Sequence, residues 1–408
     1  MESIIKHRLI AVVILLLMVI GQMGTDVYLA SLPAIHIALN TSTSTAQYTF
    51  SIFLAGFSLS QLFYGPLSDR YGRKPFIIFG LFLFTLTGLL CAFSTNIIEL
   101  LAARFFQGVG AGACTVIARA VMRDTFDGKD LNKMNIYQSM VWSMVPISAP
   151  LLGSYIQYYL GWRYNFFLLS ILSTALLVIC WFRLPETIKI KENTISLKQI
   201  LNDYRKIFYE KSFFPYLIFS SCIVSLFSVF NISAPLIIQI LFKQSVIIYG
   251  WVVFSVAITF LIGSFISRVL IHQISSKQLM LIGLIIIILA GITLLFISGM
   301  NEPTLYKFLT AIIIMQIGSA IAFPSAAAES MRPFIQKSGK SAAIFGFTLF
   351  SSSALFSGIM SYLHETCLTP FSIMINLLIV IMIFSYMMIP KTGVTEKAEI
   401  ENDKNTYY

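Results

Sequence analysis

The chain has 408 residues, of which 57% are apolar and only 11% are charged. Soluble globular domains carry about 25% charged and about 45–50% apolar residues, and a soluble fold of this composition would expose large apolar patches. The composition therefore predicts an integral membrane protein. In a soluble protein the net charge of +10 would suggest nucleic acid as a partner, so the positions of the basic residues have to be considered.

Long apolar segments follow one another along the chain. A bilayer core of ~30 Å needs about 20 apolar residues per helix, and these segments are apolar around most of the helix circumference, as buried helices are. The sequence therefore predicts an all-α membrane protein with 12 transmembrane helices, near residues 9–31, 45–67, 76–94, 98–121, 134–157, 164–183, 213–238, 247–269, 278–298, 305–328, 341–362 and 370–389.

Basic residues gather on one side of the predicted membrane. If both termini lie in the cytoplasm, inner segments hold 24 of the 28 Lys and Arg residues, among them Arg119, Arg123, Lys129 and Lys133 around one loop. The outer loops hold only Arg163, Lys243 and Lys307. This asymmetry is the positive-inside pattern of membrane proteins. It explains the basic balance by topology, and we expect no nucleic acid as a partner.

The longest break between predicted helices, residues 184–212, divides six of them from six. This break is charged and contains Pro185, and a 6+6 arrangement is typical of transporters built from two repeated halves. Gly65 and Arg70 have the same spacing as Gly263 and Arg268, which is a weak internal repeat. We expect two pseudo-symmetric six-helix bundles, 1–183 and 213–390, a cytoplasmic linker, 184–212, and a disordered cytoplasmic tail, 391–408.

The loop after the second predicted helix carries a cluster of motif residues. Residues 65–75 read GPLSDRYGRKP. We expect Gly65 to let two helices approach closely, Asp69 to pair with an arginine or a helix N-terminus, and Gly72 to permit a tight turn. The residues predicted to form a cytoplasmic gate are Gly65, Asp69, Arg70, Gly72 and Arg73.

Two of the predicted helices contain unusual residues for a bilayer. Arg104 lies inside 98–121, where a buried arginine faces a cavity or a partner, unless it snorkels to the interface. Glycines follow it closely, at positions that favour close helix packing. In 134–157, prolines free backbone carbonyls and bend the helix, although a plain kinked packing helix remains an alternative. The residues concerned in this helix are Pro146, Pro150 and Gly153.

Asp26 is the one acidic residue well inside a predicted span. A carboxyl group at that depth can bind a proton or a cationic substrate, and we assign proton coupling to it. An aspartate that is hydrated or salt-bridged near the outer end is the alternative. We expect a substrate cavity between the two bundles, lined by Gln22, Asp26, Arg104, Gln107, Trp142, Asn231 and Gln316. Asn231 and Gln316 could equally form hydrogen bonds between helices.

Several of these strings resemble known family motifs. Residues 65–75 resemble the signature loop of the major facilitator superfamily, G-x-L-x-D-R-x-G-R-[KR]-x, at every fixed position. Residues 104–108 resemble the R-x-x-Q-G motif of proton-driven drug exporters. Residues 149–154 resemble the G-P-x-x-G-G antiporter motif, with Ala149 and Ser154 replacing glycines. Across nearly the whole chain the pattern is similar to the Bcr/CflA group of drug exporters, also at residues 25–33, 56–66, 122–124 and 185–187.

This resemblance implies a proton antiporter that exports bicyclomycin-, chloramphenicol- or sulfonamide-like compounds across the bacterial inner membrane. By position, Asp26 matches the helix 1 acid that is protonated, and Arg104 matches the helix 4 arginine. Some relatives have a second helix 1 acid where this chain has Met18, so the proton stoichiometry stays open. We expect a monomer whose partners are a small-molecule substrate, protons and the lipid bilayer.

The expected mechanism is alternating access of the two bundles. Substrate would bind from inside while Asp26 is ionised, and protonation after outward opening would release it. Asp69, with Arg70 and Arg73, would latch the inner side against residues 338–341. A dedicated siderophore or metabolite exporter, a proton-coupled importer and a receptor remain alternatives.

The sequence offers little for enzyme chemistry. The histidines His7, His36, His272 and His364 lack the spacing of a metal site, and there is no GK[ST] nucleotide loop. We therefore expect no enzyme activity, no metal and no cofactor, with transport driven by the proton gradient.

Overall fold

The computed structural model describes residues 2–188, 197–210, 213–363 and 367–389, and every regular element among them is a helix. Within these residues, 12 helical segments are long and apolar enough to cross a membrane, which confirms the predicted number and the fold class. They are formed by α1 (Glu2–Asp26) with η1 (Leu29–Ser31) and α2 (Leu32–Ala38), α3 (Thr43–Tyr71), α4 (Arg73–Phe93), α5 (Ile97–Thr125), α6 (Gly128–Tyr159), α7 (Arg163–Arg183), α9 (Phe214–Leu236) with the π-helical η2 (Ile237–Leu241), α10 (Val246–Leu270), α11 (Ser276–Ser298), α12 (Leu305–Met331) with η3 (Arg332–Lys337), α13 (Ser338–Tyr362) and α14 (Thr369–Met387).

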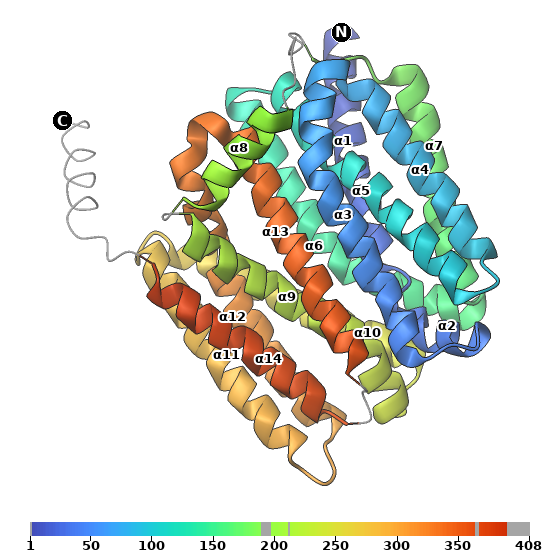
Figure 1. Cartoon of the computed structure of the whole chain (residues 1–408), viewed down its shortest axis with the longest axis vertical. Helices are drawn as coiled ribbons and strands as arrows, with labels where there is room; N and C mark the ends of the chain where they lie inside the picture. The colour runs from blue at the N-terminus through green and yellow to red at the C-terminus, as the bar shows by residue number, and fades with distance from the viewer. Residues whose placement is uncertain (1, 189–196, 211–212, 364–366, 390–408) are drawn as a thin grey trace.

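The long helices form two sets, one from α1 to α7 and one from α9 to α14, whose arrangement can be followed in Figure 1. In the first set α5 packs against α1, α3 and α4, and α7 packs against α4. In the second set α12 packs against α10 and α11, and α9 packs against α13 and α14. Two helix pairs, α3 with α13 and α6 with α10, make the main contacts between the sets. We call this boundary the seam.

The two ends of the molecule differ in charge, and we name them accordingly. The basic end holds the α3–α4 turn at Gly72, the α5–α6 turn at Asp127 and the short helix α8 (Leu197–Phe208), near the N terminus in Figure 1. The far end holds α2, the α6–α7 turn at Gly161 and the α9–α10 turn at Lys243. Each long helix runs between these ends.

The seam is closed at the far end by neutral polar contacts. Ser51 and Ser357 place their hydroxyl oxygens 2.8 Å apart across α3 and α13. Gln47 Nε2 donates to the carbonyl of Ile232 at 3.1 Å, and Gln239 Nε2 donates to the carbonyl of Ala30 at 3.0 Å. The contact continues along α3 and α13 through an edge-to-face pair of Phe57 and Phe350, with ring centroids 4.6 Å apart.

Toward the basic end, α6 is more exposed. Its buried residues are concentrated in the far half, at Val145, Ala149, Pro150, Gly153 and Ser154. Polar side chains in the other half are exposed, as at Asn135 and Ser139. The two sets are therefore held together more tightly at the far end than along the basic half of α6.

Within the first set, glycines bring α3 and α5 into direct backbone contact. A Cβ atom at Gly108 would overlap the carbonyl oxygen of Phe53, and one at Gly56 would overlap the carbonyl oxygen of Phe105. Small residues at such crossings let transmembrane helices approach closely. The packing expected from the glycines after Arg104 is therefore present.

Gly65 does not act in the expected way. A Cβ atom at Gly65 would meet no other heavy atom within 4 Å, so no helix approaches it closely in this structure. Its counterpart in the weak repeat, Gly263, does pack closely, against Ala320 and Ile317 of α12. The sequence motif identifies the position of Gly65 but does not show whether a helix packs against it.

The structure corrects one predicted segment and adds an element to another. The first span was expected as one helix over 9–31, but α1 ends at Asp26 and the chain continues as η1 and α2. The segment 184–212 was expected as a cytoplasmic linker, and it contains the short helix α8, which packs against α13. The exact domain boundaries stay a prediction, and the predicted tail 391–408 lies outside the described residues.

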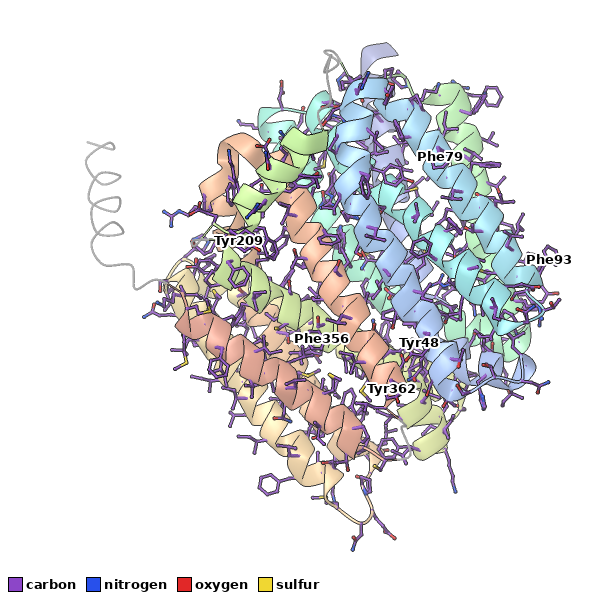
Figure 2. All side chains as sticks on the ribbon, viewed as in Figure 1. Tyr48, Phe79, Phe93, Tyr209, Phe356 and Tyr362 are labelled. Atoms are coloured by element: carbon purple, nitrogen blue, oxygen red, sulfur yellow. The ribbon has the colours of Figure 1, made fainter. Side chains whose placement is uncertain are left out.

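The outer surface of the helices is apolar. Figure 2 shows Phe79 and Phe93 on α4 pointing away from the bundle, where they are 51% and 67% exposed. In a soluble protein such side chains would form an apolar patch that promotes aggregation, whereas in a membrane protein they contact the lipid chains. The apolar exterior agrees with a multi-pass membrane protein.

The α3–α5 crossing can be tested by Gly108→Val, because the added side chain would overlap the backbone of Phe53. Overpacking of this kind costs about 1–3 kcal/mol, so we expect a clearly lower thermal unfolding temperature of the detergent-solubilised protein. Gly65→Ala is the matched control, since it has open space, and we expect less than about 0.5 kcal/mol of change. Equal effects of the two substitutions would contradict the described packing.

Candidate functional site

The broken end of α1 is the centre of the site. Pro33 has no N–H to donate to the carbonyl of Leu29, and its ring disfavours a regular helix through this segment. The chain passes through Val27 and Tyr28 and re-forms a helix as η1 and α2. A helix that ends inside a bundle leaves carbonyl groups without helical partners, and in a membrane these need protein donors.

Side chains from both sets supply donors for these carbonyls. Arg104 Nη1 of α5 donates to the carbonyl of Gly24 at 3.0 Å, and Gln239 of η2 donates to that of Ala30. On α6, a Cβ atom at Gly153 would overlap the carbonyl oxygen of Val27. The broken segment is therefore held by α5, α6 and η2 together.

Arg104 is enclosed within the first set. Its guanidinium carbon lies 4.2 Å from the ring centroids of both Tyr28 and Phe53, and Nη1 also donates to Gln107 Oε1 at 2.6 Å. The side chain is 0% exposed, so the alternative that Arg104 snorkels to the interface is wrong. Stacking on aromatic faces and hydrogen bonds to carbonyls compensate for part of the cost of burying this charge.

Asp26 is the last residue of α1, and its side chain is 3% exposed. Its Oδ2 atom is buried without a hydrogen-bond partner, and among the described residues Asp26 forms no ion pair. The alternative was an aspartate that is hydrated or salt-bridged near the outer end. The burial of Asp26 and its lack of an ion pair among the described residues do not fit that alternative. Arg104 bonds to the carbonyl of Gly24, two residues before Asp26, and to Gln107, and none of the described hydrogen bonds or ion pairs joins it to Asp26 itself.

The other residues predicted for the cavity are placed in several environments. Gln107 is buried with Arg104 in the first set. Asn231 on α9 and Gln316 on α12 are buried in the second set, and Gln316 Nε2 has no partner. Gln22 on α1 and Trp142 on α6 are half-buried. The lining of a substrate path by these residues stays a prediction.

The loop predicted as a gate forms a charged network at the basic end. Arg73 contacts Asp69 at 2.5 Å and Asp124 of α5 at 2.8 Å, and it also donates to Ser68 at 2.7 Å. Gly72 has a φ of +107°, a conformation that side chains rarely adopt. The network ties the α3–α4 turn to the end of α5.

Glu186 completes this network, although the sequence marked it only as part of the resemblance at 185–187 and suggested no role for it. Its carboxylate accepts hydrogen bonds from the backbone N–H groups of Arg73 at 2.9 Å and Lys74 at 3.2 Å, so it caps the start of α4. Burial alone would raise the pKa of Glu186, but these bonds and those from Ile188 and Thr187 outweigh it and hold the pKa below its ordinary value.

The expected latch between this loop and residues 338–341 is not what the described contacts show. The partners of Arg73 lie in α3, in α5 and at Glu186. Near the start of α13, Lys340 instead pairs with Asp203 of α8 at 2.7 Å. The neighbouring Tyr204 donates to the carbonyl of Leu62 on α3 at 2.9 Å, so α8 links the two sets at this end.

Arg119 was counted with the loop charges, but it lies within α5. Its guanidinium donates to Gln61 Oε1 of α3 at 2.9 Å, and Gly346 of α13 packs against the same oxygen. Arg119 lies near the inner end of the predicted span 98–121, and a count of charges along the sequence cannot show that its side chain bonds to a neighbouring helix.

The comparisons with known proteins agree on the family. The sequence model of the Major Facilitator Superfamily matches residues 14–358. Multidrug resistance protein MdtL from Escherichia coli O157:H7 is 29% identical over 393 residues, covering 93% of this chain and 95% of that protein. Its namesake from Shewanella oneidensis is 28% identical over 372 residues, covering 90% and 92%.

A solved structure shares the fold. The crystal structure of D-xylose-proton symporter matches with a TM-score of 0.73, covering 94% of this chain and 98% of that one. The sequence identity is 16%, so this likeness concerns the fold alone.

The cap at Glu186 can be tested by Glu186→Gln, which removes the negative charge and keeps the size. We expect the free energy of unfolding to fall by about 1 kcal/mol, which is the usual contribution of a partly solvated hydrogen bond to a charged group. Since the folded pKa is lowered, this stability is fully present above the ordinary value of 4.5 and is lost as the pH falls through the folded pKa. The thermal unfolding temperatures of the wild type and of Glu186→Gln should therefore become equal at acidic pH. Glu329→Gln, which removes a 3.7 Å ion pair with Arg332, should change little at any pH.

Proposed function

We propose that this chain, which belongs to the Major Facilitator Superfamily, is a proton-coupled antiporter that exports small, amphipathic, drug-like compounds. The multidrug resistance proteins among its relatives support export of such compounds. The loops of the basic end carry most of the Lys and Arg residues, so by the positive-inside rule this end faces the cytoplasm. We further propose that both termini lie in the cytoplasm and that the membrane is the bacterial inner membrane.

In this orientation the structure is closed toward the outside. The far-end contacts across the seam include the Ser51–Ser357 pair and the bonds from Gln47 and Gln239. These are hydrogen bonds between neutral groups, which contribute about 1 kcal/mol each. Contacts of this strength can be broken and remade in a transport cycle, as alternating access requires.

The observation that carries the proposal is the state of Asp26 at this closed end. Its carboxyl group is buried, and among the described residues it has no counter-charge. Taking an ionised carboxylate out of water without a partner costs several kcal/mol. A proton on Asp26 therefore favours closure of the far end, whereas loss of that proton favours opening.

This linkage couples the proton gradient to export. An ionised Asp26 would allow substrate to bind from the cytoplasm and the far end to open. Protonation from the outside would release the substrate and favour the closed arrangement described above. The proton would then leave to the cytoplasm, and the cycle would repeat.

The network around Arg73 is the corresponding gate on the cytoplasmic side. The open space beside Gly65 leaves room for a helix to approach when that side closes. We propose that Asp69, Arg70 and Arg73 then face the start of α13, and that the Lys340–Asp203 pair described here is rearranged. Gln22, Trp142, Asn231 and Gln316 line the proposed path of the substrate.

The coupling role can be tested with Asp26→Asn in proteoliposomes. Proton-driven efflux of chloramphenicol and of a panel of amphipathic dyes should fall at least about tenfold, because the amide cannot carry the proton. Asp26→Glu keeps a titratable group and should retain part of the activity. The thermal unfolding temperature of each variant controls for folding.

The direction of proton movement separates the proposed antiport from import. Addition of substrate on one side of wild-type proteoliposomes should drive protons toward that side. Protons that move with the substrate would show a symporter and would overturn the proposal, as would unchanged efflux by Asp26→Asn.

A further inference from the structure

Arg119 is a second arginine inside a membrane-spanning helix, and the transport cycle above gives it no role. It lies in α5 one turn after Thr115, and its side chain is half-buried. Its hydrogen bonds go to two neutral oxygens, the carbonyl of Thr115 at 3.4 Å and Gln61 Oε1 of α3 at 2.9 Å. Among the residues that the structure describes, no carboxylate forms an ion pair with Arg119. An arginine in a span without a counter-charge is costly and marks a candidate functional site.

The contact between Arg119 and Gln61 lies well inside the basic end. The helix α5 ends at Thr125 and α3 ends at Tyr71. At a rise of 1.5 Å per residue, Arg119 lies about 9 Å and Gln61 about 15 Å inside these ends. Helical side chains point back toward the N-terminus of their helix, so the guanidinium of Arg119 extends inward from its backbone to Gln61.

Gln61 places further N–H donors beside the guanidinium. Its side chain is 0% exposed, and its Oε1 accepts from Arg119, whereas its Nε2 has no hydrogen-bond partner. On the other side of the seam, a Cβ atom at Gly346 of α13 would lie 3.0 Å from the same Oε1. A buried amide nitrogen without an acceptor is uncommon and calls for an explanation. The Arg119–Gln61 pair is therefore a group of donors at the boundary of the two sets that lacks an acceptor.

The basic half of the seam is open to water at this depth. On α6, Asn135 and Ser139 are exposed and lie one turn apart on one side of the helix. The exposed side chains of Ile136 and Met140 lie on another side, which suits contact with lipid. Polar side chains exposed within a span face a water-filled space. Ser139 lies about 16 Å from the start of α6, which is about as deep as Gln61.

The charges near Arg119 favour an anion as the missing acceptor. Arg123 follows one turn later on α5, and like charges at this spacing repel each other. The acids Asp69 and Asp124 at the same end both pair with Arg73. An anionic group that entered from the basic end would supply the acceptor that Arg119 and Gln61 lack and would compensate the buried charge.

We propose that the Arg119–Gln61 pair binds the carboxylate of a transported compound from the cytoplasmic side, so that amphipathic acids are preferred substrates. The planar guanidinium carries parallel N–H donors that match the two oxygens of a carboxylate, and Gln61 Nε2 supplies a further donor. The positive charge disfavours cationic compounds at the same place. The inference rests on the proposed function and deepens it, because it names the class of compound that the exporter prefers.

The test compares two probes with the same skeleton, 1-naphthylacetate, which is an anion, and 1-naphthylacetamide, which is neutral. Their binding to the detergent-solubilised full-length protein is measured by titration calorimetry at neutral pH, with protein-free micelles as the blank. The wild type should bind the acetate at least about tenfold more tightly than the amide, because hydrogen bonds between charged groups are stronger than those to a neutral one.

Variants at the two positions separate anion binding from a merely structural role. Arg119→Gln removes the charge and should abolish the preference for the acetate, whereas Arg119→Lys keeps the charge without the planar donors and should retain part of the preference. Gln61→Glu places a carboxylate beside Arg119 that competes with the probe. It should also abolish the preference, while the thermal unfolding temperature stays equal or rises.

Arg183→Gln is the matched control. Arg183 is exposed in the last turn of α7, also at the basic end, so its substitution removes the same charge outside the seam. The affinities for both probes should be unchanged in this variant.

Equal affinities of the wild type for the two probes, or no measurable binding of either, would overturn the inference. A preference for the acetate that survives in both Arg119→Gln and Gln61→Glu would also overturn it. These results are distinct from failure of the proposed function, because the calorimetric binding needs no proton gradient. If the preference depends on Arg119 but Asp26→Asn still shows full proton-driven efflux of 1-naphthylacetate, the coupling role of Asp26 is wrong and the anion site stands.

Discussion

A helix that ends inside a membrane bundle must find donors for its last carbonyl groups, because lipid offers none. In this protein α1 ends at Asp26, and Arg104 and Gln239 supply donors to Gly24 and Ala30. For this reason side chains from α5 and η2 both contact the segment around the end of α1, and Gly153 lets α6 pack directly against the backbone of Val27. The far-end closure of the seam is built around this broken segment.

The same constraint explains the burial of an arginine and an aspartate without a bond between them. Arg104 is occupied by a carbonyl, by Gln107 and by the rings of Tyr28 and Phe53. Its charge therefore stabilises the backbone of α1, and none of the residues that the structure describes gives the carboxyl group of Asp26 a counter-charge. The buried arrangement of Asp26 is favoured when its carboxyl group carries a proton and disfavoured when it is ionised. The proposed antiport needs this dependence on the proton.

Charge is distributed differently at the two ends of the seam. The far end is joined by serine and glutamine side chains, whereas the basic end carries the network of Arg73, Asp124 and Glu186 and the Lys340–Asp203 pair. Hydrogen bonds between neutral groups contribute only about 1 kcal/mol each, so they can be broken and remade at little cost. At the basic end α8 links the two sets through the Lys340–Asp203 pair and the bond from Tyr204 to Leu62. This asymmetry supports a cycle in which the two ends open in turn.

Sequence patterns could predict the residues of the site that belong to motifs. The loop at 65–75 pointed to Asp69, Gly72 and Arg73, and a lone acid in an apolar span pointed to Asp26. Glu186 was marked only by its place in the resemblance at 185–187, which did not reveal that its carboxylate caps α4. Gly65 shows the converse limit, since its motif position did not reveal the open space beside it.

The sequence by itself determined that the chain is an all-α membrane protein with 12 spans, because apolar length and the distribution of basic residues act locally along the chain. Only the tertiary structure decided that α1 breaks after Asp26 and which groups bond to Arg104. Those features arise where helices far apart in sequence meet. Packing at such a meeting point depends on backbone approach and hydrogen-bond geometry, which no local pattern of residues contains.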